Sequence, residues 1–200
     1  MTVPAMGLPD TEWARVVDGL GLGDHAMVLY SDFEGLAPVA VRFMVAGLRD
    51  NEYVVALLPL EEMAQWRPLF DRALQATEGL EKSGTLQIIP LLPSRLTGDT
   101  GPLDLVPLMR RVIKEARIDG RTAVRALGRL SPALLERGHE RNAVAIEKFA
   151  SEQRFPLRIL CMYEATSFAA APPTTVNALV RAHTHSIAHI TGDEYLVEAL

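Results

Sequence analysis

The sequence has a single cysteine, no long apolar run and no excess of positive charge. Because Cys161 is the only cysteine among 200 residues, an intramolecular disulfide and a cluster of thiolate metal ligands are both excluded. No apolar stretch is long enough to cross a bilayer. Residues 1–10 contain no basic side chain and no long apolar segment, which is untypical of a secretory signal. These absences predict a cytoplasmic protein that does not act at a membrane.

The charge balance of the chain is acidic. It carries 20 Lys and Arg against 25 Asp and Glu, a formal net charge of -5, which argues against a nucleic-acid-binding surface. The basic run Arg110, Arg111 and Lys114 is interspersed with other residues in a way typical of the solvated face of a helix. With 48% hydrophobic and 22% charged residues, the composition is that of a globular chain. The length suits one domain with a sizeable core.

Short apolar runs alternate with longer amphipathic segments along most of the chain. Strands buried on both faces are expected over residues 25–30, 53–58, 85–91, 122–127 and 157–163. Helices are expected over residues 36–48, 61–78, 103–116 and 140–153. In the last of these, Ala143 and Ile146 lie on the apolar stripe and Glu147 is expected to face water. The alternation predicts an α/β fold, a three-layer sandwich whose mostly parallel central sheet has five or more strands.

Two loops and the two ends of the chain complete the expected organisation. Loop 93–102 is predicted to lie on the surface, and loop 128–138 to overhang the carboxyl edge of the sheet, where open α/β sheets usually bind ligands. Residues 194–200 are expected to form a terminal helix that docks on the domain or swaps between copies. The expected units are an N-terminal extension or helix at 1–22, an α/β domain at 23–190 and a C-terminal tail at 191–200.

Residues 25–62 are similar to the opening of RecA/KaiC-type ATPase domains. A His-led strand, a loop, a helix ending in Gly47-Leu48, a second strand and the paired acids Glu61-Glu62 follow one another at the spacing of those domains. The acids stand where the family places its catalytic carboxylates. Acids in the first turn of a helix are also stabilised by its macrodipole, so a structural role is open as well. The resemblance implies a RecA/KaiC-like fold.

The loop within this segment lacks the groups that bind a phosphate. A P-loop needs glycines, a Lys for the terminal phosphates and a Ser or Thr hydroxyl for Mg²⁺. Here Leu36 stands at the Lys position, Ala37 stands at the Ser/Thr position, and Asp32 and Glu34 add negative charge. The strand expected at 122–127 ends without an acid to hold Mg²⁺. We therefore expect a degenerate P-loop, no ATP hydrolysis and no bound cofactor. The loop consists of Ser31, Asp32, Phe33, Glu34, Gly35, Leu36 and Ala37.

Three motifs, one of them within this segment, point to a narrower family. They are His25 to Tyr30 before the acidic loop, Cys161-Met-Tyr-Glu164 before Phe168, and Leu179…His183-Thr-His-Ser-Ile187. They resemble motifs of the MEDS domain, the sensory domain of a dichloromethane-responsive bacterial regulator and of methanogen proteins. Glu164 replaces the usual Asp, Thr184 replaces the usual Pro, and the acid followed by Trp that is usual on the fourth strand and its loop is absent. The resemblance spans residues 23–190 and implies a degenerate relative of the RecA/KaiC-type ATPases with a sensory role.

Several polar side chains are candidates for contacting a small ligand. Tyr163 and Glu164 end one expected strand, and side chains from neighbouring strands and the loop are expected to converge with them on one edge of the sheet. The resemblance further implies that His183 caps the last helix and points at Tyr163 and Glu164. The alternative is that the edge residues form a satisfied polar network. The full candidate set is Tyr30, Asp32, Arg125, Tyr163, Glu164 and His183.

Metal binding and nucleophilic catalysis are not expected. The spacing of His183, His185 and His189 suits neither one helical face nor a compact metal site. His25 begins a strand and is predicted to be a structural hydrogen-bonding residue. Cys161 is predicted to be buried inside a strand. No serine has the Gly-x-Ser-x-Gly context of a nucleophile elbow.

These features favour a non-catalytic sensory or regulatory module of bacterial signal transduction. It would act through protein contacts, with or without a small ligand at the former nucleotide pocket. One alternative is a nucleotide-binding sensor without hydrolysis, and another is a small-molecule hydrolase that uses Tyr163, Glu164 and His183. The expected partners are a second copy of the chain and a signalling protein such as a kinase, response regulator or anti-sigma component. The apolar residues 195–200 are expected to pack at such an interface or to fold back on their own domain.

Overall fold

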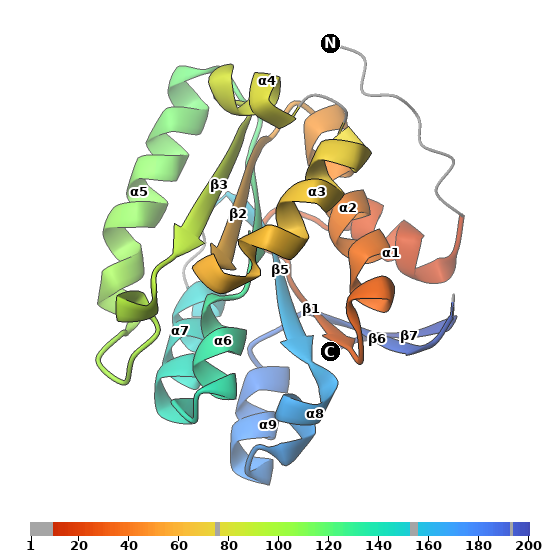
Figure 1. Ribbon diagram of the computed structural model, residues 1–200, viewed down its shortest axis with the longest axis vertical. Helices are drawn as coiled ribbons and strands as arrows, with labels where there is room; N and C mark the ends of the chain where they lie inside the picture. The colour runs from red at the N-terminus through yellow and green to blue at the C-terminus, as the bar shows by residue number, and fades with distance from the viewer. Residues whose placement is uncertain (1–9, 75–76, 153–155, 193) are drawn as a thin grey trace.

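A seven-stranded sheet runs through the computed structural model, which describes residues 10–74, 77–152, 156–192 and 194–200 (Figure 1). The strands are β1 (His25–Tyr30), β2 (Tyr53–Pro59), β3 (Leu86–Leu91), β4 (Val124–Gly128), β5 (Leu157–Glu164), β6 (His185–Thr191) and β7 (Glu194–Ala199). They lie in the order β3-β2-β4-β5-β1-β6-β7. Neighbouring strands are parallel except β6 and β7, which are antiparallel.

Helices cover both faces of the sheet and bury one apolar core on each (Figure 1). The first face carries α1 (Glu12–Gly19), α2 (Phe33–Arg49), α3 (Met63–Leu74) and α4 (Thr77–Lys82). The second carries α5 (Pro102–Ile118), α6 (Leu130–Glu136), α7 (Glu140–Glu152), α8 (Ala165–Ala170) and α9 (Pro173–Val180). Two short 3-10 turns, η1 (Leu60–Glu62) and η2 (Pro93–Arg95), follow β2 and β3. Within the described residues, no helix is both long and apolar enough to cross a membrane.

The predicted fold class is confirmed, a three-layer α/β sandwich with a mostly parallel central sheet. All five expected strands are present, because their apolar side chains are needed on both faces of the sheet. The helix expected over 61–78 is divided into η1, α3 and α4, and residues 75–76 within it lie outside the described residues. Residue 153, where the helix expected over 140–153 was to end, lies outside them too.

The terminal helix expected over residues 194–200 is wrong. Residues 194–199 form β7, which pairs with β6, a strand that the sequence did not predict. Tyr195 and Val197 pack on the core, whereas Leu196 is 55% and Leu200 46% exposed, so the segment alternates with the period of a strand. The Tyr195 ring lies 5.1 Å from the ring of Trp13 in α1, centroid to centroid. The tail therefore folds back on its own domain.

Candidate functional site

Arg129 fills the carboxyl edge of the sheet, where ligands bind in open α/β folds. It directly follows β4 and is 4% exposed. Its guanidinium donates to Glu62 at 2.7 Å and Glu136 at 3.0 Å, and also to the Tyr30 hydroxyl at 2.5 Å and the Met162 carbonyl at 3.0 Å. One cation is thus surrounded by two carboxylates and two neutral oxygens, so the protein's own groups already supply the hydrogen-bond partners of Arg129.

The pKa values in this network follow from burial and from the neighbouring charges. Burial raises the pKa of Tyr30 above its ordinary value, although the charge of Arg129 opposes the change. Burial would lower the pKa of Arg129, but Tyr30, Glu62 and Glu136 outweigh it and raise the pKa. Burial also raises the pKa of Glu136, and Arg129 offsets part of that increase. At neutral pH, Arg129 is a fixed cation and Tyr30 is an un-ionised phenol.

The paired acids Glu61 and Glu62 both form ion pairs across this edge. Glu62 accepts hydrogen bonds from Arg129 and from the indole of Trp66, the latter at 3.0 Å. Glu61 pairs with Arg137, which follows α6. These contacts hold η1 against the segment after β4 and favour the structural interpretation of the two acids.

The loop between β1 and α2 is closed by one of its own carboxylates. Asp32 is the N-cap of α2, and its side chain accepts a hydrogen bond from the Gly35 backbone N–H at 2.8 Å. A helix N-terminus is a favourable place for an anion, and here the Asp32 carboxylate already occupies it. Leu36 is 1% exposed and belongs to the core, so its side chain points away from solvent.

Gly35 brings the β6–β7 hairpin against this loop. The Tyr195 hydroxyl donates to the Gly35 carbonyl at 2.7 Å, and a Cβ added at Gly35 would lie 2.1 Å from the His189 ring. We expect Gly35→Ala to lower the free energy of unfolding by about 1–3 kcal/mol, because the ring must move to relieve the overlap. Denaturant unfolding measures this loss, and His189→Ala in the same chain is expected to recover most of it.

Gly19→Ala is the matched control for this substitution. Gly19 also lies in a helix, and an added Cβ would meet nothing within 4 Å. The change should therefore be neutral or stabilising by up to about 1 kcal/mol. Equal effects of Gly35→Ala and Gly19→Ala would contradict the close approach of His189.

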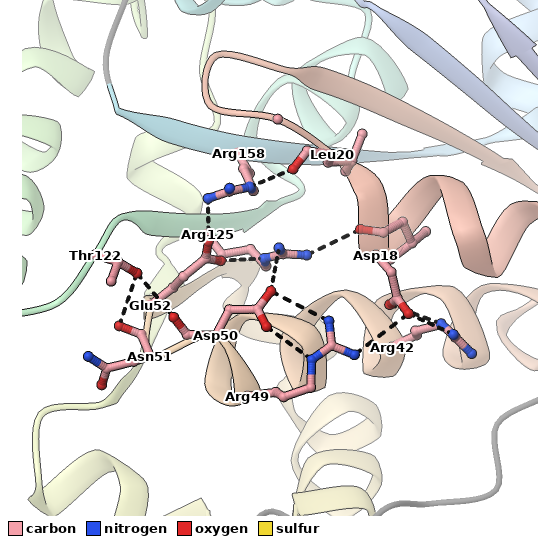
Figure 2. Close-up of polar contacts among 12 residues, drawn as sticks. Asp18, Leu20, Arg42, Arg49, Asp50, Asn51, Glu52, Thr122, Arg125 and Arg158 are labelled. Carbon is pink, nitrogen blue, oxygen red and sulfur yellow. Dashed lines mark hydrogen bonds and ion pairs between the residues drawn. The ribbon is translucent and has the colours of Figure 1, made fainter.

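Arg125 lies at the opposite edge of the sheet from the one expected. It is the second residue of β4, near the amino ends of the parallel strands, and it is fully buried. Figure 2 shows its guanidinium pointing at Glu52, whose carboxylate accepts its Nε–H at 2.6 Å. It also donates to the Val17 carbonyl at 3.2 Å, and Arg158 pairs with the second carboxylate oxygen of Glu52. The expected convergence of Arg125 with Tyr30 is therefore wrong.

The other predicted ligand residues separate into two groups. Tyr30, Asp32 and Glu164 remain at the carboxyl edge, where Glu164 accepts a hydrogen bond from Ser167 N–H at 3.0 Å and caps α8. The hydrogen bonds from Ser167 lower the pKa of Glu164. Tyr163 points to the other side of β5, into the core beneath α6 and α7.

The three histidines that follow α9 do not form one site. His183 caps that helix as expected, with its Nδ1 2.7 Å from the Leu179 carbonyl, and its ring centroid lies 6.0 Å from that of Tyr163. The Nδ1 of His185 lies 2.9 Å from the Thr184 hydroxyl. His189 lies on the hairpin against Gly35, as described above.

A buried cluster of four ionisable side chains lies where β1, β5, α7 and the end of α9 meet. Its members are His25, Glu147, Cys161 and His183. Glu147 was expected to face water, but it is 1% exposed, and its Oε2 lies 2.9 Å from His25 Nε2. Cys161 is buried as predicted, with its sulfur 3.2 Å from the same His25 nitrogen. The Tyr163 hydroxyl donates to Glu147 Oε1 at 2.5 Å and also lies 3.1 Å from the Ser131 hydroxyl.

The electrostatics of the cluster keep Glu147 ionised and keep His183 and Cys161 neutral. Burial would raise the pKa of Glu147, but His25 and His183 outweigh it and hold the pKa well below the ordinary range. Burial and the neighbouring His25 lower the pKa of His183 to about 4, so its imidazole is neutral at physiological pH. Burial and Glu147 raise the pKa of the Cys161 thiol well above its ordinary value.

A cavity of about 70 Å³ adjoins the cluster, between the sheet and helices α5 and α7. Most of its wall is apolar and includes Leu57, Leu105, Met109, Ala126, Ile146 and Phe149. Its polar residues are His25, Ser131, Glu147 and Cys161. The site thus combines a small apolar space with a strongly polar end.

Sequence reasoning missed three residues that organise these sites, namely Glu52, Arg129 and Glu147. Each is a charged residue that the fold buries, and each stands within or beside a strongly apolar segment. Glu147 follows Ala143 by four positions, which places it on the apolar stripe of α7. That spacing was the feature of the sequence that could have predicted the burial of Glu147.

Solved structures of other proteins share this fold. A KaiC-like protein of the hyperthermophilic archaeon Pyrococcus horikoshii OT3 superposes with a TM-score of 0.57 at 12% identity, covering 91% of this chain and 82% of its own. A second protein of that organism, which carries a structural-project name, has a TM-score of 0.58 at 11% identity and covers 94% and 91%. At this identity, the likeness concerns the fold alone.

The family is given by the sequence profile. The model of the MEDS family, the methanogen/methylotroph DcmR sensory domain, matches residues 24–184. The chain therefore belongs to the MEDS family, and the predicted resemblance is confirmed at that level. A sensory or regulatory role is consistent with this membership. No curated protein matches the chain in sequence.

Proposed function

We propose that this chain is a non-catalytic sensory domain that binds a small, largely apolar molecule in the cavity beneath α5 and α7, and not a nucleotide at the carboxyl edge. The observation that carries the proposal is the cavity itself, an apolar space with polar groups at one end. Binding there would be transmitted through protein contacts to a separate signalling protein.

The carboxyl edge offers little to a nucleotide. Asp32 places a carboxylate at the N-terminus of α2, where a phosphate would have to bind, and Glu34 adds a second acid in the first turn. Leu36 and Ala37 supply neither an ammonium group nor a hydroxyl. Arg129, the nearby cation, is already held by Glu62 and Glu136. These contacts support a degenerate P-loop and oppose the alternative of a nucleotide-binding sensor.

The cavity fits a molecule of a few heavy atoms. A buried water needs roughly 10–15 Å³ of such space, so about 70 Å³ holds more than one water but not a large ligand. An apolar wall makes water a poor occupant, since water needs two or more polar partners. His25, Glu147 and Cys161 at the polar end would orient an occupant that carries one polar atom.

The hydrolase alternative meets an obstacle in the same place. Tyr163 is 1% exposed and its hydroxyl already donates to Glu147, while Glu164 caps α8. Burial and then Glu147 raise the pKa of Tyr163 well above its ordinary value, which makes it a poor nucleophile or base. The Nδ1 of His183 is hydrogen-bonded to the Leu179 carbonyl, so only Nε2 is left to act as a base.

Two ligand experiments test the proposal. Calorimetric titration with Mg-ATP is expected to show no saturable binding at millimolar concentration. Xenon, a small apolar probe, is expected to enter the cavity and to appear as a peak beside Ala126 and Ile146 in a crystal under xenon pressure. Saturable Mg-ATP binding would contradict the choice of site, and a cavity without xenon would contradict the proposed occupant.

A matched pair of variants makes the xenon result specific. Ala150 lies on α7 and lines the cavity, so Ala150→Leu should fill part of it and abolish the xenon peak. Ala170→Leu makes the same change on an exposed position of α8 and should leave the peak intact. If both variants retain xenon, the gas occupies some other space and the proposal fails.

A further inference from the structure

The buried cluster beside the cavity has the composition of a transition-metal site. His25, Glu147, Cys161 and His183 come from four different parts of the chain, and their ligand atoms all lie within 4.8 Å of one another. The printed sequence gives no metal-binding spacing, because the four residues are brought together only by the fold. All four side chains are buried.

The distances between the ligand atoms are close to those of a tetrahedral site. His25 Nε2 lies 2.9 Å from Glu147 Oε2 and 3.2 Å from Cys161 Sγ, which is itself 3.5 Å from Glu147 Oε2. His183 Nε2 lies 3.7 Å from the same carboxylate oxygen. Zinc bonds of about 2.0–2.3 Å to N, O and S place tetrahedral ligand atoms about 3.3–3.6 Å apart. Four of the six distances are therefore near those of a tetrahedral site. The other two, from His183 to His25 and to Cys161, are at most 4.8 Å, so the His183 ring would move towards the other ligands on binding an ion.

His183 has a ring nitrogen that lacks a partner and faces the cluster. Its Nδ1 lies 2.7 Å from the Leu179 carbonyl, and because a carbonyl only accepts, the N–H is on Nδ1. Nε2 then carries a lone pair. It is buried, has no hydrogen-bond partner among the described residues, and faces the Glu147 carboxylate, which is also an acceptor. A histidine that donates one N–H to a backbone carbonyl commonly binds a metal through its other nitrogen.

Glu147 is held in the same manner. The Tyr163 hydroxyl donates to Oε1, which leaves Oε2 facing His25, Cys161 and His183. One carboxylate and one thiolate together carry two negative charges, and the two imidazoles are neutral ligands. A divalent cation would neutralise this set in a place where an unpaired charge is costly.

We propose that His25, Glu147, Cys161 and His183 bind a single Zn²⁺ ion in a closed tetrahedral site. Two imidazoles, one thiolate and one carboxylate are ligands that suit zinc and the similar ion Co²⁺, and do not suit Mg²⁺ or Ca²⁺. On binding, the thiol proton of Cys161 is released to solvent. The site shares His25, Glu147 and Cys161 with the polar end of the cavity, so a bound ion would leave the apolar wall and Ser131 to hold the cavity ligand. Titration with Co²⁺ needs no cavity ligand, so it tests the metal site separately from the proposed function.

The test uses the full chain, freed of metal with a chelator and titrated with Co²⁺. A single equivalent is expected to bind, with the strong visible absorption of tetrahedral Co²⁺ and a thiolate-to-metal charge-transfer band, and Zn²⁺ should displace it. The competing interpretation is a metal-free buried ion pair of His25 and Glu147. Absence of stoichiometric binding by the native chain would establish that interpretation and overturn the proposal.

Three variants locate the ion. Cys161→Ser and His183→Gln are each expected to weaken Co²⁺ binding by about 100-fold or more, and Cys161→Ser should also abolish the charge-transfer band. Tyr163→Phe keeps all four ligands and removes the hydrogen bond to Glu147, so it should weaken binding by about 10–100-fold. If either ligand variant does not fold, the Co²⁺ affinity of Tyr163→Phe tests whether the ion binds at the buried cluster.

His185→Gln is the matched control for His183→Gln. His185 lies two positions further along the chain, bonds to Thr184 and is not a member of the cluster. It is expected to leave Co²⁺ affinity unchanged. If His185→Gln weakens binding while Cys161→Ser and Tyr163→Phe do not, the ion is bound at the surface and the buried site is refuted.

Discussion

Replacing Glu52 with alanine is expected to lower the free energy of unfolding by about 3–5 kcal/mol. Glu52 is 1% exposed and accepts hydrogen bonds from two arginines, one of which, Arg125, is fully buried (Figure 2). Without Glu52, the Arg125 guanidinium would keep the Val17 carbonyl as a partner, with Asp50 3.9 Å away on the more exposed side. A buried cation that loses its closest counter-charge is among the largest single-residue penalties in a folded protein.

Urea unfolding at neutral pH measures this loss in free energy. Two further variants serve as comparisons. Glu52→Gln keeps the shape and part of the hydrogen bonding, so its cost should fall between the wild-type and Glu52→Ala. Glu78→Ala removes an acid that is 75% exposed and pairs with Lys82 on the surface, and it should cost less than about 1 kcal/mol. A cost for Glu52→Ala no larger than for Glu78→Ala would mean that Arg125 is not buried as described.

The parts of the fold that the sequence predicts are those in which burial dictates composition. Strands β1 to β5 are apolar because helices cover both of their faces, and that pattern is visible without a structure. Strand β7 is at one edge of the sheet and β6 lies next to it, and in β7 only alternate residues are partly buried. In β6, Ile187 alone is buried, and its neighbours in the strand are four polar and two apolar residues, so the run is too mixed to predict a strand.

The candidate site was harder to predict because it depends on where each strand begins. Expecting a strand at 122–127 placed Arg125 towards the carboxyl edge, but β4 begins at Val124, so Arg125 lies at the amino edge and Arg129 takes the carboxyl edge. A difference of two residues in the start of this strand was enough to place Arg125, and not Arg129, at the carboxyl edge. Glu147 was assigned to water by its charge, although its position on α7 places it on the apolar side.

The errors on Arg125 and Glu147 have a common physical cause. Each concerns a charged residue whose burial is favourable only because a distant part of the chain supplies its partner. Arg125 is 73 positions from Glu52 in sequence, and Glu147 of α7 meets His25 of β1 on the face of the sheet that α7 covers. Sequence patterns report on the average environment of a residue type, whereas these ion pairs depend on long-range register.

Arg129→Met is expected to destabilise the domain by about 3 kcal/mol at neutral pH, and by less in mild acid. Methionine fills much of the same volume, but it leaves the Glu62 and Glu136 carboxylates close together without a cation. It also removes the donor to the Met162 carbonyl. Burial already raises the pKa of Glu136, and Arg129 now holds that increase down.

The expected pH dependence follows from this change in Glu136. In the variant, the folded-state pKa of this carboxyl rises further above its unfolded value, so the folded chain binds more protons than the unfolded chain in mildly acidic solution. Its stability therefore increases as the pH falls through that window. The difference between wild-type and Arg129→Met should be larger at pH 8 than at pH 5 when both are unfolded in urea.

Arg137→Met serves as the control for the carboxyl edge. Arg137 pairs with Glu61, but its side chain is 33% and that of Glu61 47% exposed, so water can replace the lost contact. The cost should be below about 1 kcal/mol and similar at both pH values. If Arg129→Met shows a small, pH-independent cost like that of Arg137→Met, the edge is open to solvent. Its acids would then be free to serve a ligand, and the choice of the cavity over the carboxyl edge would lose its main support.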